Sequence, residues 1–209
     1  YKKGATIFVR SDHQKKIHTK ADSIAEEMVG QIKFNFPAGS FFQNNPYILE
    51  KFTDHVRKEA KSNDSKFLVD AYCGAGLFAL TSAKSFDEVT GIEISDDSIL
   101  WAKKNLKENK INNVKFISGK IENIFSDIEY SGNETSVIID PPRKGCSEDF
   151  LIQLFKFKPR KVVYVSCNPA TQMRDLKLFI KNGYELKRTQ PFDLFPQTRH
   201  LECIMTLEI

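Results

Sequence analysis

From Lys66 onward, short apolar runs alternate regularly with longer amphipathic stretches. The apolar runs have the length and β-branched content of strands, and the stretches between them have a helical period. This alternation is typical of βαβ units and predicts an α/β fold with a doubly wound, mostly parallel sheet. The predicted strands are Phe67–Ala71, Val89–Ile94, Val114–Ile117, Val137–Ile139 and Val162–Ser166, and the predicted helices are Leu77–Ser85, Asp97–Asn109, Ile121–Phe125 and Glu148–Phe155.

The two ends of the chain depart from this alternation. Two strand-like segments after Gly183, Tyr184–Thr189 and His200–Glu208, are most easily placed as an antiparallel pair at the edge of the sheet. We expect residues 1–40 to be the tail of a preceding domain packed on the main domain, residues 41–209, whose first helix runs to about Ala60. The elements predicted in the tail are a strand at Ala5–Arg10, a short helix at Ala21–Val29 and a strand at Gln31–Phe36.

The strand Val162–Ser166 ends at a cysteine, Cys167. Asn168 and Pro169 break the strand, and Ala170–Ile180 is the predicted helix that follows. Cys167 therefore lies at the carboxyl end of a parallel strand, where open α/β sheets bind their ligands. A thiol at this edge can act as a nucleophile if its pKa is lowered, although on this stretch alone a cysteine that only packs is the simpler interpretation.

A tight glycine turn follows the first predicted strand of the sheet. Gly74 and Gly76 lie one residue apart, and Glu93 ends the next strand, where a carboxylate can accept both hydroxyls of a ribose. Asp70 precedes the glycines and would repel a pyrophosphate, so a cationic nucleoside cofactor fits better than a dinucleotide. S-adenosylmethionine, with its sulfonium and amino groups, matches this chemistry.

A second polar loop follows the fourth predicted strand. Asp140 is followed by Pro141 and Pro142, which stiffen the backbone and hold the carboxylate at the ligand edge of the sheet. Trp101 lies on the helix after Glu93, and we expect it to be a core residue. We also expect a structural role for Cys73, Cys146 and Cys203.

Cysteine spacing and charge limit the class of protein. The four cysteines form no CxxC pair and no metal-like pattern with the four histidines, which predicts free thiols, no metal site and an intracellular location, with cytoplasm, nucleus and mitochondrion all open. No apolar run is long enough to cross a bilayer. The net charge of +4 permits an anionic partner. Basic residues cluster before and after the strand Val162–Ser166, at Lys156, Lys158, Arg160, Lys161, Arg174, Lys177 and Lys181.

Five motifs in order resemble the RNA 5-methyluridine methyltransferases, and most of all the fungal tRNA branch that forms ribothymidine in the T-loop. They are Phe42-Gln43-x-Asn45, Asp70-x-Tyr72-Cys73-Gly74-x-Gly76, Asp140-Pro141-Pro142-Arg143, Ser166-Cys167-Asn168-Pro169 and His200-Leu201-Glu202. The likeness runs from about Gly4 to the end of the chain. The family also has an amino-terminal RNA-binding domain of OB type, which this sequence does not contain, so we expect a catalytic-domain fragment.

The resemblance implies a Rossmann-like class I methyltransferase fold, S-adenosylmethionine as cofactor and the T-loop uridine of tRNA as substrate. It makes Cys167 the nucleophile and Glu202 the base. The positions that it assigns to cofactor binding are Gln43, Tyr72, Gly74, Glu93 and Asp140. Leu77 stands where the tRNA enzymes often have asparagine, so no contact is carried over there. Nothing in the sequence demands assembly, and we expect a monomer.

The chemistry explains why these residue types are needed. Carbon 5 of uracil is a weak nucleophile until a thiolate adds to carbon 6 and makes the ring an enolate. A carboxylate then removes the carbon-5 proton, so that elimination can free the cysteine. The uracil must leave its stack to reach Cys167. Arg143 and the lysines around Phe157 are candidates for phosphate contacts.

Three alternatives remain open from the sequence. The first is the same chemistry on ribosomal RNA. The second is an amino-group methyltransferase, in which the residue after the two prolines is usually aromatic, whereas here it is Arg143. Such an enzyme would keep turnover in Cys167→Ala. The third is a non-catalytic RNA-binding or folding module, whose RNA binding would survive the loss of both Cys167 and Glu202.

Overall fold

The computed structural model describes residues 10–11, 16–17, 24–43, 45–119, 125 and 128–209. The strands are β1 (Arg10–Ser11), β2 (Lys16–Ile17), β3 (Ile24–Val29), β4 (Ile32–Pro37), β5 (Phe67–Ala71), β6 (Glu88–Glu93), β7 (Val114–Ser118), β8 (Thr135–Ile139), β9 (Lys161–Ser166), β10 (Glu185–Phe192) and β11 (Glu202–Glu208). The helices are α1 (Pro46–Ala60), α2 (Leu77–Ser82), α3 (Asp96–Glu108), α4 (Glu148–Phe157) and α5 (Pro169–Lys181), with short 3₁₀ turns at Ala83–Ser85 and Gly132–Glu134. None of these helices is both long and apolar enough to cross a bilayer.

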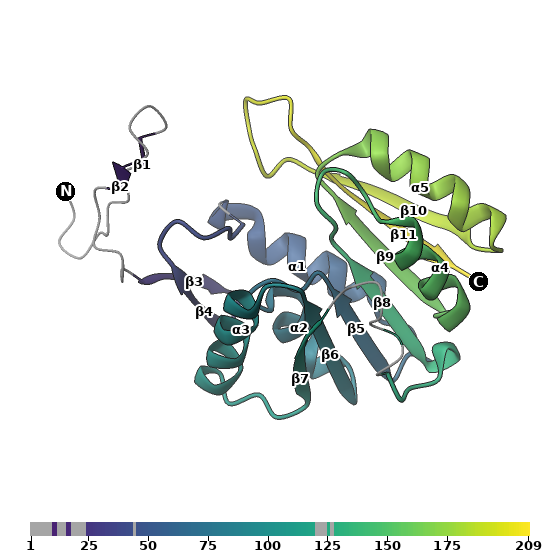
Figure 1. The fold of residues 1–209 in the computed structure, drawn as a ribbon, viewed down its shortest axis with the longest axis horizontal. Coiled ribbons are helices and arrows are strands. Elements are labelled where there is room, and N and C mark those ends of the chain that lie inside the picture. The colour runs from purple at the N-terminus through teal and green to yellow at the C-terminus, as the bar shows by residue number, and fades with distance from the viewer. Residues whose placement is uncertain (1–9, 12–15, 18–23, 44, 120–124, 126–127) are drawn as a thin grey trace.

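One seven-stranded sheet forms the centre of the molecule, with the strand order β10-β11-β9-β8-β5-β6-β7 (Figure 1). Strands β5 to β9 are parallel, whereas β11 pairs antiparallel with β9, and β10 pairs antiparallel with β11. The chain leaves β5 toward β6 on one side and later returns to β8 on the other. The carboxyl ends of β5 and β8 therefore border the switch point where open α/β sheets bind ligands.

Helices cover both faces of the sheet, and each face has its own apolar core. One core joins α1, α2 and α3 to inward residues such as Leu68 and Val163. The other joins α4 and α5 to the opposite set, such as Val69 and Tyr164. Because successive strand residues alternate between these two cores, β8 and β9 are buried along their whole length.

Polar residues at the strand ends start the helices that lead away from the ligand edge. Ser95 and Ser147 accept hydrogen bonds from the backbone amides of Ser98 and Phe150, both at 3.3 Å, and so cap α3 and α4. Asn168 caps α5 by accepting from the Ala170 amide at 3.2 Å. Ser95 and Asn168 lie two residues after strands β6 and β9, and Ser147 ends the loop after β8.

The main α/β prediction is confirmed. All five predicted parallel strands, the helices from α2 to α5 within the described part, and the antiparallel edge pair are present. The predicted helix Ala21–Val29 is wrong, because β3 pairs with β4 across a turn at Gly30, where φ is +59°. Strand pairing outweighs the helix propensity of these residues, and their exposure alternates with the period of a strand. The predicted strand Ala5–Arg10 and helix Ile121–Phe125 lie almost wholly outside the described residues.

Two asparagines attach the β3–β4 hairpin to the main sheet, the buried Asn105 of α3 and the half-buried Asn109, which directly follows this helix. The Asn105 side chain accepts from the Asn35 amide at 2.8 Å and donates to the Ala75 carbonyl at 3.2 Å. Asn109 accepts from the Lys33 amide at 2.9 Å and donates to its carbonyl at 2.7 Å. The hairpin is thus bonded to the glycine turn after β5. The domain boundary near residue 40 stays a prediction.

We predict that Asn105→Ala lowers the free energy of unfolding by about 1–3 kcal/mol, because it leaves buried backbone groups of the hairpin and the glycine turn without partners. Urea denaturation measures the loss. The matched control is Asn182→Ala, since Asn182 makes only an exposed bond to the Leu178 carbonyl and its removal should cost less than about 0.5 kcal/mol. Equal losses in the two variants would contradict this account.

Candidate functional site

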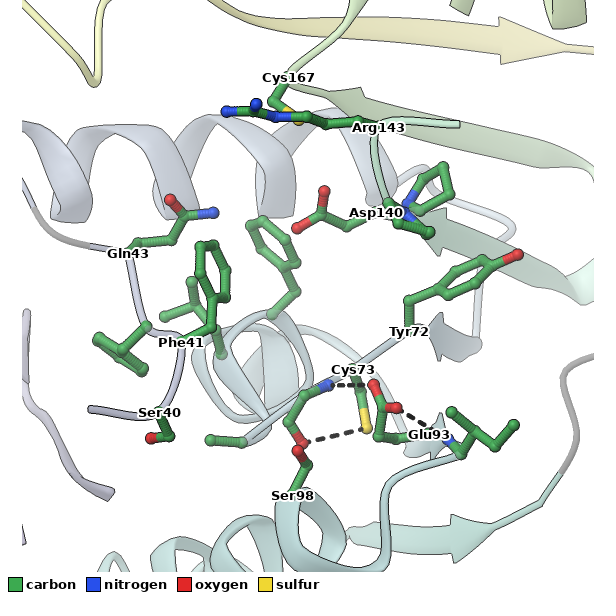
Figure 2. A pocket seen from close by; sticks show the side chains of 18 of the residues that line it. Ser40, Phe41, Gln43, Tyr72, Cys73, Glu93, Ser98, Asp140, Arg143 and Cys167 are labelled. Atoms are coloured by element: carbon green, nitrogen blue, oxygen red, sulfur yellow. Dashed lines mark hydrogen bonds between the residues drawn. The ribbon is translucent and has the colours of Figure 1, made fainter. Parts of the chain in front are cut away.

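A pocket of about 730 Å³ opens at the carboxyl ends of the parallel strands. Loops after β5, β6, β8 and β9 form its floor and one side, and the segment between β4 and α1 forms the other side. The loop between β10 and β11 reaches its rim. Figure 2 shows side chains from these separate elements converging on one space. The pocket lies where the sheet topology predicts a ligand site.

The turn after β5 is built for close backbone approach. Gly74 and Gly76 have φ of +53° and +90°, which favours glycine, and Tyr72 also has a positive φ of +65°. A side chain at Gly76 would meet the Phe116 ring at 2.8 Å, whereas a Cβ at Gly74 would enter open space beside the pocket. Gly76 is therefore needed for packing, and Gly74 leaves room for a ligand.

Glu93 ends β6 beside this turn. Its carboxylate accepts hydrogen bonds from the Gly74 amide at 3.2 Å, the Ile94 amide at 2.9 Å and the Ser95 amide at 3.0 Å. These amides fix the carboxylate at the pocket wall, where it lies across from the glycine turn (Figure 2).

Asp70 lies under the glycine turn and is completely buried. One carboxylate oxygen accepts from the Ala79 amide of α2 at 2.8 Å, and the other has no partner among the described residues. Burial raises the pKa of Asp70 to about 8, which the Ala79 bond partly opposes. Burial therefore favours the neutral form of the Asp70 carboxyl, which supports the glycine turn from below and is not among the residues that line the pocket.

Gln43 forms the opposite wall. Stacking of Phe42 on Phe36, with ring centroids 4.3 Å apart, anchors the segment that carries it. Asn45 donates to the Leu194 carbonyl at 3.2 Å and ties the same segment to the loop before β11. The Gln43 amide points toward the Asp140 carboxyl (Figure 2), and its buried oxygen has no partner among the described residues.

The loop after β8 carries Asp140 and Arg143 into the pocket. Burial raises the pKa of Asp140 well above its usual range, and the nearby Glu202 carboxyl raises it further. Both effects favour the neutral form of the Asp140 carboxyl. The Arg143 guanidinium lies beside the Cys167 thiol (Figure 2).

Cys167 and Glu202 meet across the pairing of β9 with β11. Ser166 is the register partner of Cys203, so the next position brings Cys167 opposite Glu202. Glu202 is only 3% exposed, and one of its carboxylate oxygens has no partner among the described residues. Burial raises the pKa of Glu202 to about 7, against the effect of the Arg143 guanidinium. A half-buried thiol therefore faces a carboxyl that changes its charge near neutral pH.

The pKa of Cys167 is raised by burial first, and then by the Glu202 and Asp140 carboxyls. The Arg143 guanidinium is the group that opposes them. Burial and the two carboxyls therefore favour the protonated form of the Cys167 thiol. Added positive charge near the two carboxyls would favour the thiolate.

The structure brings every sequence-predicted site residue to this one pocket. Its lining includes Gln43, Tyr72, Gly74, Glu93, Asp140, Cys167 and Glu202. The expectation that Trp101 is a core residue is wrong. Trp101 is half-buried and lines the pocket, with the Lys104 ammonium 4.0 Å from its ring centroid, because the buried stripe of α3 runs along other positions.

Several lining residues were not predicted from the sequence. Asp97 and Ser98 belong to the first turns of α3, and Phe195 and His200 come from the loop before β11. Their position directly after or before the site strands was the available signal for them. Among the described residues, no group of three or more histidine, cysteine or acidic side chains is placed to hold a metal ion.

A family model described as tRNA (Uracil-5-)-methyltransferase matches residues 4–209. The tRNA (uracil(54)-C(5))-methyltransferase of Schizosaccharomyces pombe is 45% identical over 99% of this chain and 42% of its own length. The enzyme of the same description from Saccharomyces cerevisiae is 48% identical over 90% of this chain and 31% of its own length. The chain thus spans less than half the length of these curated relatives.

Solved structures confirm the expected fold class. The Pyrococcus abyssi tRNA (uracil-54, C5)-methyltransferase in complex with S-adenosyl-L-homocysteine matches with a TM-score of 0.76 and 29% identity, over 92% of this chain and 45% of that chain. M. jannaschii TYW2 in complex with AdoMet matches with a TM-score of 0.63, over 92% of this chain and 90% of that chain. At 20% identity, this likeness supports the fold alone.

We predict that iodoacetamide modifies Cys167 first in the native protein, about tenfold faster than the other three cysteines. Cys167 is half-buried, whereas Cys73, which also lines the pocket, Cys146 and Cys203 are each buried. Peptide mass spectrometry after brief labelling identifies the modified residue. Cys167→Ser should remove the fast phase, and comparable labelling of any buried cysteine would contradict the geometry.

Proposed function

We propose that this chain, which belongs to the tRNA (uracil-5-)-methyltransferase family, transfers a methyl group from S-adenosylmethionine to carbon 5 of uridine 54 in tRNA. The observation that carries the proposal is the meeting of Cys167 and Glu202 in the same pocket as the Glu93 glycine turn. A nucleophile, a base and a nucleoside site thus share one space, as methyl addition to an unreactive carbon requires.

The residues around the glycine turn fit the cofactor. The Glu93 carboxylate is held where it can accept ribose hydroxyls, and Gly74 leaves open space for the ligand beside it. S-adenosylmethionine supplies a methyl group on a positively charged sulfur. In our proposal, Glu93 and the glycine turn bind its nucleoside.

Cys167 begins the reaction by adding to the base. Its sulfur forms a bond to carbon 6 of the uracil, the double bond between carbons 5 and 6 breaks, and the electron pair becomes an enolate. Carbon 5 then forms a bond to the methyl group, the bond between this methyl group and the sulfonium sulfur of S-adenosylmethionine breaks, and S-adenosylhomocysteine leaves. Arg143, beside the thiol, favours the thiolate form of Cys167 that this step needs.

Glu202 completes the reaction. Its carboxylate takes the proton from carbon 5, the double bond to carbon 6 forms again, and the bond between carbon 6 and sulfur breaks to free Cys167 as a thiolate. A carboxylate that only solvates a strand would be exposed. Glu202 is instead buried, and one of its oxygens has no partner among the described residues. A pKa near 7 suits a general base at neutral pH.

Two polar groups across the pocket suit the edge of a uracil. The free oxygen of Gln43 can accept from a ring N–H. Asp140, kept neutral by burial and by Glu202, can donate its proton in a hydrogen bond to a carbonyl oxygen and stabilise the charge that grows there in the enolate. Both positions line the same pocket as Glu93 and Cys167.

We predict that S-adenosylmethionine and a T-loop RNA with 5-fluorouridine at the target position trap a covalent complex. Fluorine replaces the proton that Glu202 removes, so the reaction stops after methyl transfer with Cys167 still bonded to the base. Intact-protein mass should show the protein plus one methylated RNA.

Cys167→Ala is the matched control and should give no adduct, while it keeps its affinity for S-adenosylhomocysteine in calorimetry. Formation of the adduct in Cys167→Ala would overturn the assignment of the nucleophile. Turnover on unmodified RNA by the same variant would favour an amino-group methyltransferase instead.

We predict that kcat rises with pH through an inflection near 7, because Glu202 removes a proton only in its ionised form. Below this pH the carboxyl is protonated, and the rate should fall about tenfold for each pH unit. Ionisation of Cys167, whose pKa is raised, adds a further rise at higher pH. A rate that is flat or falling between pH 6 and 8 under saturating substrates would contradict the base role.

A further inference from the structure

A buried carboxylate on α5 holds the loop that carries Arg143. Asp175 is only 1% exposed and lies on the side of α5 that faces the sheet. It accepts from the Tyr164 hydroxyl at 2.7 Å, the Cys146 backbone amide at 3.0 Å and the Arg174 side chain at 2.8 Å. A buried carboxylate is costly unless it is fully paired, so this arrangement is a built network.

Arg174 extends the same network along the loop. While it pairs with Asp175, its guanidinium also donates to the Lys144 carbonyl at 3.1 Å and the Cys146 carbonyl at 3.4 Å. Two residues at the start of α5, Asn168 and Thr171, donate to the Arg143 carbonyl at 3.0 and 3.2 Å. Side chains of α5 therefore hold the backbone of the whole Arg143–Cys146 loop.

The loop itself fits closely against Arg174 and Asp175, which we call the clamp. Gly145 has a φ of +80°, and a Cβ there would lie 2.5 Å from the Arg174 guanidinium and 2.7 Å from the Asp175 carboxylate. Only glycine permits so close an approach between loop and helix. Loop and clamp thus fit each other in the region that leads directly to Arg143.

We propose that Asp175 and Arg174 are positioning residues. They hold the Arg143–Cys146 loop in place, and this loop in turn holds the Arg143 guanidinium beside the Cys167 thiol. The inference rests on the proposed function for the role of Cys167 as nucleophile. Neither clamp residue lines the pocket, so each acts through the loop.

The charges around the thiol explain why this matters. Glu202 from β11 and Asp140 from the loop after β8 both disfavour the thiolate, and Arg143 is the cation that favours it. If the Arg143–Cys146 part of the loop loosens, the guanidinium moves away. Glu202 stays on β11, and Asp140 stays at the end of β8, where its backbone amide donates to the Ala71 carbonyl at 3.4 Å. Loss of the clamp should therefore raise the pKa of Cys167 and slow its reactions at a given pH.

The test is the pH dependence of Cys167 alkylation by iodoacetamide, followed by peptide mass spectrometry, which needs neither RNA nor cofactor. We expect Asp175→Asn and Arg174→Met to shift the profile upward and to slow labelling at pH 8 by about threefold to tenfold. Arg143→Met should do the same. In the Arg143→Met background, Asp175→Asn should have no further effect, because the clamp acts only through Arg143.

Lys177→Met is the matched control. Lys177 is exposed on the next turn of α5 and forms no ion pair among the described residues, so its loss removes one charge and leaves the clamp intact. We expect its alkylation profile to be unchanged. Equal slowing in Lys177→Met would mean that net charge sets the reactivity, and full additivity of Asp175→Asn with Arg143→Met would mean a general loosening. Either result overturns the clamp.

The variants also separate this inference from other roles. If thermal unfolding shows that Asp175→Asn is not folded, the alkylation profile of Arg174→Met alone tests the clamp. An unchanged alkylation profile with weaker RNA binding and a smaller salt dependence in Arg174→Met would make Arg174 a phosphate contact, and would refute the clamp. A normal shift in the profile without any trapped RNA adduct would refute the proposed function and leave the clamp standing.

Discussion

The site depends on the antiparallel pairing of β11 with β9. This pairing brings Glu202, a residue almost at the end of the chain, against Cys167, which follows a central strand. Pairing of the strands leaves Glu202 buried and Cys167 half-buried, and this burial raises the pKa of both groups. The buried cores on both sides of β9 make the register costly to change, since a slip by one residue would turn every side chain to the other face.

Three carboxyl groups lie at the carboxyl ends of the parallel strands, and they differ in burial and in hydrogen-bond partners. Glu93 is held by three backbone amides. Asp70 and Asp140 are instead buried, with raised pKa values and with few partners. The positive charge of Arg143 faces the thiol from the same loop that carries Asp140. This arrangement suits a reaction in which a cationic methyl donor and a thiolate must be stabilised in one small space.

Most of the fold and the main site residues could be predicted from the sequence, for physical reasons. Buried parallel strands such as Val162–Ser166 have a distinctive apolar pattern, and their carboxyl ends must share one edge, so Asp140 and Cys167 were placed together. The prediction is correct for the second strand of the hairpin, Gln31–Phe36, and wrong for β3, because the strand form of β3 is set by its pairing with β4. The orientation of Trp101 and the network at Asp175 depend on how helices pack, which local sequence does not specify.

The most direct test of the paired Cys167 and Glu202 is the fate of Glu202→Gln with S-adenosylmethionine and an unmodified T-loop RNA. Glutamine keeps the shape of the side chain but cannot take the carbon-5 proton. Denaturing intact-mass analysis should then show a methylated RNA bonded to Cys167, which accumulates because elimination is blocked, with little free product. Normal turnover by Glu202→Gln without any adduct would contradict the account, since the proton would then leave by another route.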